Sequence, residues 1–323
     1  MADQLQLDQL IMQAGTIAVS GHEHPDGDCA GSVTGLYHYI KNVCPQSRVD
    51  VYLEKIPDAY GFIGDGIPIR GLIDEDVPVY DLFISLDCGE PARLGFSRPV
   101  FERAKKTACI DHHISNTGFA DVNLINPDAS STSEMLAGVM SGKYMDAQIA
   151  RSLFLGIVHD TGVFQYPSTS PDTHRIAADL LEYGFDASDL ITVTYYEKTL
   201  NQQRICARAI ENARLMLDGK VIVSTITQEE MAACHVLPEH LDGIVAQMRD
   251  TAGVECAVFL YERKKGQWKV SLRARRYTDM RLVAQAFGGG GHRKAAGVTF
   301  DTDDPEYVID QITAQIRLQL EEQ

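Results

Sequence analysis

The sequence predicts an α/β protein: an N-terminal domain built on a mostly parallel sheet with helices on both faces, a helical linker, and a smaller C-terminal α/β domain. Apolar strand-like segments alternate with helical patterns as far as residue 160, and three of these segments end at Asp or His. A second alternating pattern begins at residue 221, after a long helical stretch. The length of 323 residues allows two domains with a core each, and we expect them at 1–189 and 218–323, with the linker at 190–217.

The N-terminal domain is expected to begin with a short amphipathic helix over residues 5–11, followed by a buried strand at 16–19. Runs of apolar residues predict four further strands at 49–53, 80–86, 107–110 and 122–125. The segment 57–78 is rich in Gly and Pro and is predicted to be irregular. Helical spacing of apolar residues predicts helices over 31–40, 99–106, 147–160 and 172–183. Ser131 and Glu134 have capping-box spacing, which predicts the start of another helix.

The linker is predicted from two helical segments, 186–196 and 201–217, which contain neither Gly nor Pro. Beyond it, strands are expected at 221–225, 256–262, 267–275 and 298–300. The turn Lys264-Lys265-Gly266 predicts a hairpin between the second and third of them. Thr227 and Glu230 form a second capping-box pattern. Amphipathic patterns predict helices over 280–287 and 307–320.

The composition limits the classes of function. A formal net charge of −16 argues against a broad basic face that would hold duplex DNA. The seven cysteines are scattered and never spaced as CxxC, so we expect buried thiols in a reducing compartment, without a zinc ribbon or a disulfide framework. The first ten residues carry acids where a signal peptide has a basic flank, and no apolar stretch is long enough to span a bilayer. We therefore expect a cytoplasmic protein that binds neither duplex DNA nor a membrane.

The segment 21–32, GHEHPDGDCAGS, is the first candidate functional site. It places His22, Asp26 and Asp28 around a Pro-Asp-Gly turn between a buried strand and a helix. Open α/β sheets bind their ligands at such strand-to-helix turns, and imidazole and carboxylate groups are ligands for divalent cations. The alternative is an Asp-rich turn that only caps the helix.

More acids and histidines follow later strands and helices. The full set of candidates is His22, Asp26, Asp28, Asp87, Asp111, His112, His113 and Asp160. In a parallel sheet they would meet at one edge, where two cations about 3.5–4 Å apart could share a carboxylate, turn a water into hydroxide and hold a phosphoryl group. Mixed nitrogen and oxygen ligands favour Mn²⁺, then Mg²⁺ or Co²⁺, over a structural Zn²⁺. Taken singly, each Asp is also explained as a helix cap or solvated turn, and each His as a buried imidazole.

The second candidate site is the segment 288–297, GGGGHRKAAG. A packed strand or helix would not be expected to contain four successive glycines, whereas exposed backbone N–H groups beside His292 can bind phosphate or carboxylate oxygens. Residues 263–281 form a basic stretch in which Arg273 lies on one face of a strand. Trp268 and Tyr277 could stack on a base, although such aromatics more often belong to a core. The alternatives are a flexible linker and a solvated hairpin.

These segments resemble the motifs of the DHH phosphoesterase superfamily, named for the triplet Asp111-His112-His113. HEHPDGDCAGS, LDCGEPARLG, IDHH and GIVHDTGVFQY resemble its four N-terminal motifs, and VSLRARRYTDMRLVAQAFGGGGHRKAAG resembles the DHH-associated C-terminal domain. Size and layout are similar to the NrnA type, nano-RNA exonucleases that also act as phosphatases on 3′-phosphoadenosine 5′-phosphate. Two positions beside the motif residues depart from the family: His24 stands where Asn is usual, and Glu90 where Asp is common.

The resemblance implies residue roles. The ligands of two Mn²⁺ ions would be His22, Asp26, Asp28, Asp87, His112 and Asp160, with Asp87 as the bridge. His113 would contact the scissile phosphate, and Asp111 would orient a histidine. The distal end of the substrate would be held by Arg273, Gly289, Gly290, Gly291 and His292.

The expected function is manganese-dependent hydrolysis of short oligoribonucleotides, of 3′-phosphoadenosine 5′-phosphate, or of both, in a cleft between the two domains. One alternative is a phosphodiesterase for linear or cyclic dinucleotides. The other is a non-catalytic nucleotide-binding module, which would be expected to lack a ligand residue, and none is missing here. The expected partner is a short single-stranded RNA or a nucleotide. The sequence leaves the oligomeric state open, with a homodimer as one possibility.

Overall fold

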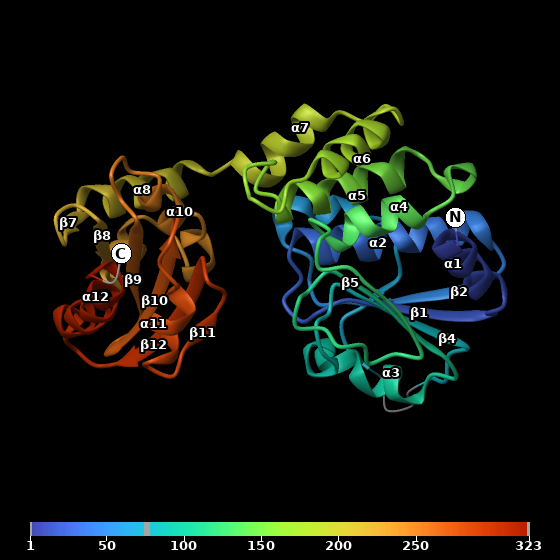
Figure 1. Cartoon of the computed structure of the whole chain (residues 1–323), viewed down its shortest axis with the longest axis horizontal. Helices are drawn as coiled ribbons and strands as arrows, with labels where there is room; N and C mark the ends of the chain where they lie inside the picture. Colours follow the sequence, from blue (N-terminus) through green and yellow to red (C-terminus); the bar gives the residue numbers. More distant parts are fainter. Residues whose placement is uncertain (1, 74–77, 322–323) are drawn as a thin grey trace. The chain divides into compact units, whose positions relative to one another are not determined.

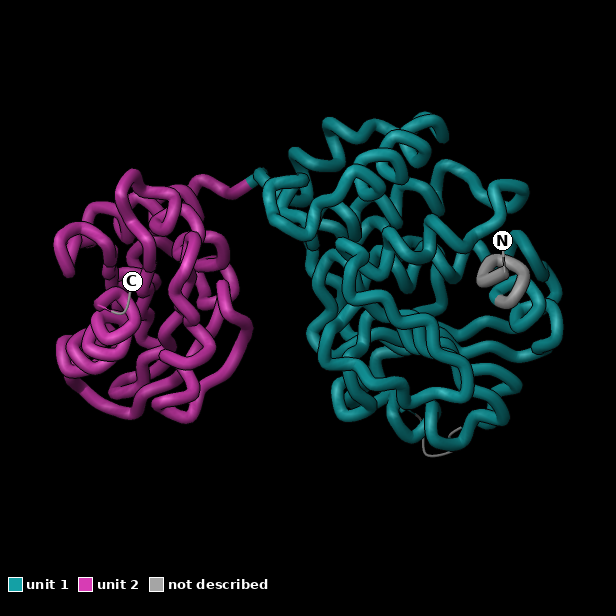
Figure 2. Tube along the Cα trace, viewed as in Figure 1, with its two compact units in different colours: residues 1–197 teal, residues 198–323 magenta. Residues whose placement is uncertain are grey.

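The computed structural model describes residues 2–73 and 78–321. The chain divides into two compact units, Met1–Glu197 and Lys198–Gln323 (Figure 2). Each unit contains its own sheet and its own hydrophobic core.

Unit 1 is built on six parallel strands in the order β3-β2-β1-β4-β5-β6. The strands are β1 Thr16–Ser20, β2 Arg48–Tyr52, β3 Ile69–Arg70, β4 Leu82–Leu86, β5 Thr107–Asp111 and β6 Val122–Ile125. The chain runs outward from β1 to β3 and then returns to the other side of β1 at β4. The gap between β1 and β4 is therefore the switch point of the sheet, where open α/β sheets bind ligands beyond the carboxyl ends of their strands.

Helices cover both faces of this sheet, as predicted. Unit 1 contains α1 Ala2–Met12, α2 Gly27–Val43, α3 Arg98–Arg103, α4 Thr132–Val139, α5 Ala147–Asp160, α6 Pro171–Leu181 and α7 Ala187–Ile191. Shorter helical turns are η1 Asp58–Gly64, η2 Pro91–Ser97, η3 Gly142–Tyr144 and the π-helical turn η4 Thr192–Tyr196. Figure 1 shows α2, α4 and α5 on one face and α3 on the other. The buried residues accordingly form two clusters, a large one with α2 and α5 and a smaller one around Phe83 and Phe101.

Helices α2 and α5 pack closely because glycines of α2 leave room for residues of α5. A Cβ atom at Gly31 of α2 would lie 2.4 Å from the carbonyl oxygen of Ser152 in α5, and a Cβ at Gly27 would lie 2.3 Å from the His159 ring. This approach brings the N-terminus of α2 beside the C-terminus of α5. The polar residues at these two helix ends are thereby placed near each other.

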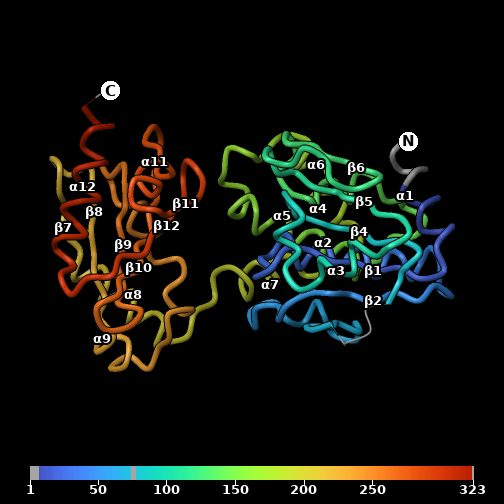
Figure 3. Tube along the Cα trace, turned by 90° about the horizontal axis from the view of Figure 1, so that it is seen from below, coloured from blue at the N-terminus to red at the C-terminus, as the bar shows by residue number. Residues whose placement is uncertain are grey.

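Unit 2 contains a second six-stranded sheet, in the order β11-β12-β10-β9-β8-β7, in which only β8 and β9 are parallel. Its strands are β7 Arg214–Met216, β8 Val221–Ile226, β9 Cys256–Lys264, β10 Gln267–Ala274, β11 Gly290–Gly291 and β12 Ala295–Asp301. Its helices are α8 Leu200–Glu211, α9 Gln228–Ala233, α10 Ile244–Arg249, α11 Met280–Gln285 and α12 Pro305–Glu321, with the turn η5 Pro238–Leu241. Helix α12 runs beside β7 and β8, as both Figure 1 and Figure 3 show. The predicted capping box of Thr227 and Glu230 is present at the start of α9.

Several sequence predictions differ from the structure. The helix expected over 201–217 ends at Glu211, because residues 214–216 pair with β8 as an edge strand. The segment expected to be a linker is divided: α7 belongs to unit 1, and α8 packs into the core of unit 2 through Ile205 and Ala209. The irregular segment 57–78 contains the turn η1 and the short strand β3, which pairs with β2.

Two further corrections concern unit 2. The glycine run was not expected in a strand, yet Gly290 and Gly291 form β11, whose pairing with β12 needs no side chain. Trp268 is only 4% exposed and packs in the core, so it is not available to stack on a base.

No helix in residues 2–73 and 78–321 is both long enough and apolar enough to cross a membrane.

Candidate metal centre

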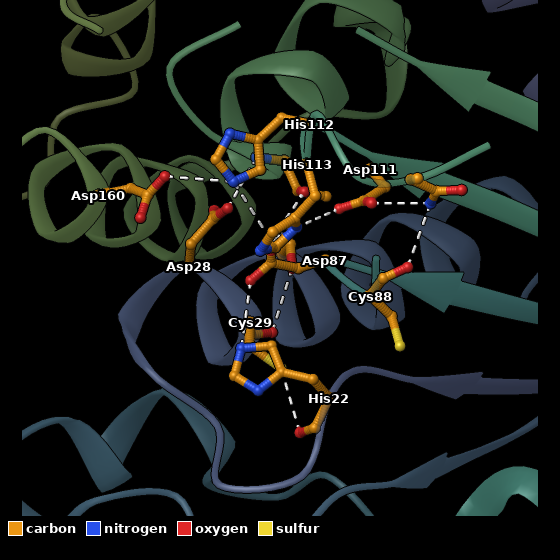
Figure 4. A network of polar contacts seen from close by, with 12 residues as sticks. His22, Asp28, Cys29, Asp87, Cys88, Asp111, His112, His113 and Asp160 are labelled. Carbon is orange, nitrogen blue, oxygen red and sulfur yellow. Dashed lines mark hydrogen bonds and ion pairs between the residues drawn. The ribbon is translucent and has the colours of Figure 1, made fainter. Parts of the chain in front are cut away.

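The predicted ligands of unit 1 meet at the switch point of its sheet (Figure 4). His22 follows β1, Asp87 follows β4, and His112 follows β5. The other carboxylates come from the close helix pair: Asp28 from the first turn of α2, and Asp160 from the last residue of α5. The site therefore forms because three adjacent strands and two glycine-packed helices end at one place.

Asp87 lies at the centre of the group and is 2% exposed. One of its oxygens is 3.5 Å from His22 Nε2, and the other is 3.5 Å from His112 Nε2 and 3.6 Å from His113 Nδ1. Burial would raise the pKa of Asp87, but hydrogen bonds with His112 and His22 hold it below its usual range. The backbone at Asp87 is left-handed, with φ of 52°, a conformation that Asp adopts more readily than most residues. Because its two oxygens face different imidazoles, the Asp87 carboxylate could be shared by two cations.

The two predicted histidine ligands present the same ring nitrogen to the centre. His22 Nδ1 lies 2.8 Å from the carbonyl oxygen of Glu23, which leaves Nε2 facing the acids. His112 Nε2 is also 3.3 Å from Asp160 Oδ2. Burial by itself lowers the pKa of His22, but the neighbouring acids outweigh it and raise this pKa to about 10. The pKa of His112 is likewise lowered by burial but raised overall to about 10, first by its hydrogen bond with Asp87.

Asp26 caps a helix and also lies near the centre. Its Oδ1 accepts hydrogen bonds from the backbone N–H groups of Asp28 and Cys29, both at 3.1 Å, as expected for the helix-cap alternative. The same oxygen is 3.7 Å from His22 Nε2, so the cap does not remove the side chain from the site.

Asp28 is buried, and its carboxylate faces the start of α4. Its oxygens accept hydrogen bonds from the backbone N–H groups of Thr132 at 2.7 Å and Ser133 at 2.9 Å. Burial, followed by the charges of Asp87 and Asp160, raises the pKa of Asp28 well above its usual value. The N-terminus of α4 compensates part of this charge through its free N–H groups and its dipole.

Asp160 lies at the C-terminal end of α5, where the helix dipole disfavours a negative charge. Burial raises the pKa of Asp160 to about 7; His112 lowers it, while the charges of Asp87 and Asp26 raise it further. Burial and the neighbouring acids therefore outweigh His112, and a further positive charge beside Asp160 would favour its ionised form.

Asp111 connects the second histidine of the triplet to the sheet. It accepts hydrogen bonds from His113 Nδ1 and from Asn116 Nδ2, each at 2.7 Å. The first of these raises the pKa of His113 above its ordinary value, although burial opposes it. Asn116 also donates to the backbone carbonyl of Cys88, next to Asp87. The His113 ring is thus held with its Nε2 edge away from Asp111.

The predicted ligands are held in place by residues that the sequence did not indicate, namely Thr132, Ser133 and Asn116. Thr132 also donates its hydroxyl to Asp87 Oδ1 at 3.2 Å. The helix-start pattern at Ser131 signalled free N–H groups at this position, but nothing in it indicated that Asp28, more than 100 residues earlier, would accept from them. His24 was predicted to flank the site: it is 89% exposed and pairs with Glu54 Oε2 at 3.0 Å. The backbone at His24 is left-handed, with φ of 56°, a conformation that His adopts more readily than most residues.

The side chains fit divalent cations. Within the described residues, three groups have ligand atoms that all lie within 4.8 Å of one another. They are His22, Cys29 and Asp87; Asp87, His112 and His113; and Asp28, His112 and Asp160. Because Asp87 occurs in two groups and has two carboxylate oxygens, neighbouring cations could share it. Oxygen and imidazole donors are typical of sites for hard or borderline divalent metals.

The predicted substrate residues of unit 2 lie on β10 and on β11 with its flanking residues, and both strands pair with β12. Lys269, Ser271 and Arg273 alternate along β10 with core residues, and opposite them on β12 stand Thr299, Gly297 and Ala295. This polar face therefore carries two cationic side chains among small neighbours.

The glycines of β11 allow close contact with β12. A Cβ at Gly289 would lie 2.4 Å from the carbonyl oxygen of Gly297, and one at Gly291 would lie 2.5 Å from that of Ala295. His292 follows β11, is exposed, and donates its backbone N–H to Ala295. The backbone N–H groups of Gly288 and Gly289 also donate hydrogen bonds within unit 2, so the donors that suit an anionic group are the side chains of His292 and Arg273.

Comparison with known protein families agrees with this architecture. Residues 16–157 match the DHH family, N-terminal domain, and residues 218–322 match the DHHA1 domain. The chain therefore contains an N-terminal domain of the DHH family followed by a DHHA1 domain. The two matches fall one in each structural unit, and together they include every predicted site residue except Asp160.

Curated relatives match over almost the whole chain. The bifunctional oligoribonuclease and PAP phosphatase NrnA of Thermus thermophilus is 27% identical, covering 95% of this chain and 90% of its own length. The protein of the same name from Bacillus subtilis is 26% identical, with 91% and 92% covered. An exopolyphosphatase-related protein from Bacteroides fragilis superposes with a TM-score of 0.88 at 24% identity, covering 98% of this chain and 97% of that one. The last comparison confirms the predicted fold.

Proposed function

We propose that the protein is a manganese-dependent phosphoesterase that hydrolyses short oligoribonucleotides and 3′-phosphoadenosine 5′-phosphate. The observation that carries the proposal is the position of Asp87, whose carboxylate lies 3.5 Å from the Nε2 atoms of both His22 and His112 at the switch point of the sheet. The two curated relatives above, similar to this chain over most of their length, are named for these two activities. A hydrolase acting on phosphoester bonds is the enzyme class of this family.

The residues of unit 1 would divide the work. Two divalent cations would be held by His22, Asp26, Asp28, Asp87, His112 and Asp160. Mn²⁺ suits this mixture of imidazole and carboxylate donors better than Mg²⁺, which prefers oxygen ligands alone. When bound, such a pair activates water for attack and neutralises charge on the phosphoryl group.

His113 would donate a hydrogen bond to the phosphoryl group. Its Nδ1 is engaged by Asp111, and the raised pKa of His113 favours the form in which Nε2 also carries a proton. A fixed N–H donor directed at an oxygen that gains charge stabilises the transition state more than the ground state. Asp111 and Asn116 would act by keeping this ring in place.

Unit 2 would bind an anionic part of the substrate. Arg273 would contact phosphate oxygens in bidentate fashion, and the side chain of His292 would supply a further donor. This assignment predicts that His292→Ala raises the Michaelis constant for a dinucleotide while the affinity for Mn²⁺ stays the same.

A hydrolysis panel tests the proposed function. The full-length protein with Mn²⁺ is offered di- to pentaribonucleotides, 3′-phosphoadenosine 5′-phosphate, a 5′-phosphorylated diadenylate and polyphosphate. We expect release of mononucleotides from the short RNAs and of phosphate from the phosphoadenosine substrate. Preference for the diadenylate would instead favour the dinucleotide phosphodiesterase, and binding without turnover of any substrate would favour the nucleotide-binding module.

Two variants connect the activity to the centre. Asp87→Asn should lower turnover by at least about 10³-fold, because the amide cannot be shared by two cations. Asp65→Asn makes the same chemical change at an exposed position of unit 1 and should leave turnover unchanged. Wild-type turnover in Asp87→Asn would refute the proposed centre.

A further inference from the structure

A buried thiol lies within the metal centre and has no role in the function proposed above. Cys29 is the third residue of α2 and has no exposed surface. Its Sγ atom belongs to the group of ligand atoms, with His22 and Asp87, that all lie within 4.8 Å of one another. Figure 4 shows Cys29 next to His22 in the network of polar contacts.

The loop that carries His22 is shaped around this sulfur. A Cβ atom at Gly21 would lie 2.2 Å from Cys29 Sγ, so the thiol occupies the space that a side chain at position 21 would need. The sulfur is also 3.8 Å from the carbonyl oxygen of His22. Cys29, in the first turn of α2, is therefore held against Gly21 and His22 just after β1 and is not an isolated core cysteine.

These three side chains form a donor set different from that of the rest of the centre. An imidazole nitrogen, a thiolate sulfur and a carboxylate oxygen together suit Zn²⁺ and similar thiophilic ions, whereas Mn²⁺ and Mg²⁺ gain little from sulfur. With bonds of about 2.0–2.3 Å, two ligands of a tetrahedral ion lie roughly 3.3–3.8 Å apart. His22 Nε2 and Asp87 Oδ2, at 3.5 Å, already have this separation.

We propose that His22, Cys29 and Asp87 form a site for a thiophilic divalent cation of the Zn²⁺ and Cd²⁺ class. On binding, the metal–sulfur bond forms as the thiol proton passes to water, and no oxidation state changes. Because two of the three ligands are also ligands proposed for Mn²⁺, the thiophilic ion and Mn²⁺ compete. The centre would then be inhibited by thiophilic ions, independently of which phosphoester it hydrolyses.

Cadmium titration tests the proposal without using activity. Cd²⁺ is added to the full-length, chelator-treated protein, and the thiolate-to-cadmium charge-transfer absorption is followed in the ultraviolet. We expect a saturable band that disappears in Cys29→Ser, with Cd²⁺ affinity weakened by about tenfold or more. Cys206→Ser is the matched control, because it removes a more accessible thiol of unit 2, and it should retain the band.

Two results would overturn the proposal: a band that persists in Cys29→Ser, and a band that disappears in Cys206→Ser instead. A competition experiment with the wild-type protein guards against misfolding of the serine variant. Increasing Mn²⁺ should suppress the cadmium band, because both ions need His22 and Asp87. A cadmium band insensitive to Mn²⁺ would place the thiophilic ion elsewhere and refute the site.

Discussion

Replacing Gly156 with Ala should damage both the packing of α5 and the metal centre. A Cβ at this position would lie 2.0 Å from Ser133 Oγ, 2.8 Å from Ser133 Cβ and 2.7 Å from Asp28 Oδ1. Overpacking of this kind costs about 1–3 kcal/mol, and the better helix propensity of Ala offsets up to about 1 kcal/mol of it. With three contacts below 3.0 Å, we expect a net loss of about 2 kcal/mol. For a domain of the size of unit 1, this corresponds to a fall in melting temperature of about 4–8 °C.

Gly138→Ala provides the matched control for this experiment. Gly138 also lies in a helix, but it is exposed and a Cβ there would meet no atom within 4 Å. The substitution should stabilise the protein by up to about 1 kcal/mol.

The assay is thermal unfolding of the full-length variants with and without Mn²⁺. Because the new methyl group pushes against Asp28, Gly156→Ala should also weaken Mn²⁺ binding by about 10–100-fold, which reduces the stabilisation by Mn²⁺. If Gly156→Ala matched Gly138→Ala in melting temperature and in its response to Mn²⁺, the close packing of α2, α4 and α5 around Asp28 would be wrong.

Three further predictions follow from the same contacts. Because the pKa values of His22 and His112 are about 10, Mn²⁺ must displace their protons, so its affinity should rise with pH, and calorimetry in buffers of different ionisation enthalpy should detect proton release. Equal enthalpies in the two buffers would contradict this. Burial would raise the pKa of Asp50, but hydrogen bonds from a Tyr hydroxyl and an Arg guanidinium lower this pKa in the folded protein. The stability that Asp50 contributes is therefore complete above its pKa in the unfolded chain, about 3.9, and is lost as the pH falls through its lowered pKa in the folded protein. Asp50→Asn should therefore flatten the acid limb of the unfolding free energy, and an unchanged limb would exclude this role. Gly291→Ala, at a φ of 138° and with its Cβ 2.5 Å from a carbonyl oxygen, should destabilise the protein by about 1–3 kcal/mol in urea unfolding. Gly290→Ala, into open space, should change little, and equal effects of the two would refute the close pairing of β11.

Local patterns in the sequence predicted most elements of the fold. Every strand of unit 1 except β3 was predicted from a run of apolar residues, and α5 spans the predicted residues 147–160. These predictions succeed because a buried parallel strand and an amphipathic helix each impose their own spacing on nearby residues. The predictions that failed involve long-range pairing. Residues 214–216 have a helical pattern but pair with β8, and Gly290 and Gly291 have no strand pattern but pair with β12.

The site, like the fold, depends partly on local sequence patterns and partly on long-range contacts. By itself, the sequence determined which side chains follow the strands, because His22, Asp87 and His112 all come within three residues of the end of an apolar run. Only the tertiary structure decided what surrounds them. The N–H groups that bind Asp28 belong to a helix 104 residues later in the chain, and the sulfur of Cys29 lies beside His22 because Gly21 leaves room for it. Such contacts depend on how close two backbones come, which is set by the packing of whole elements and leaves no periodic trace in the sequence.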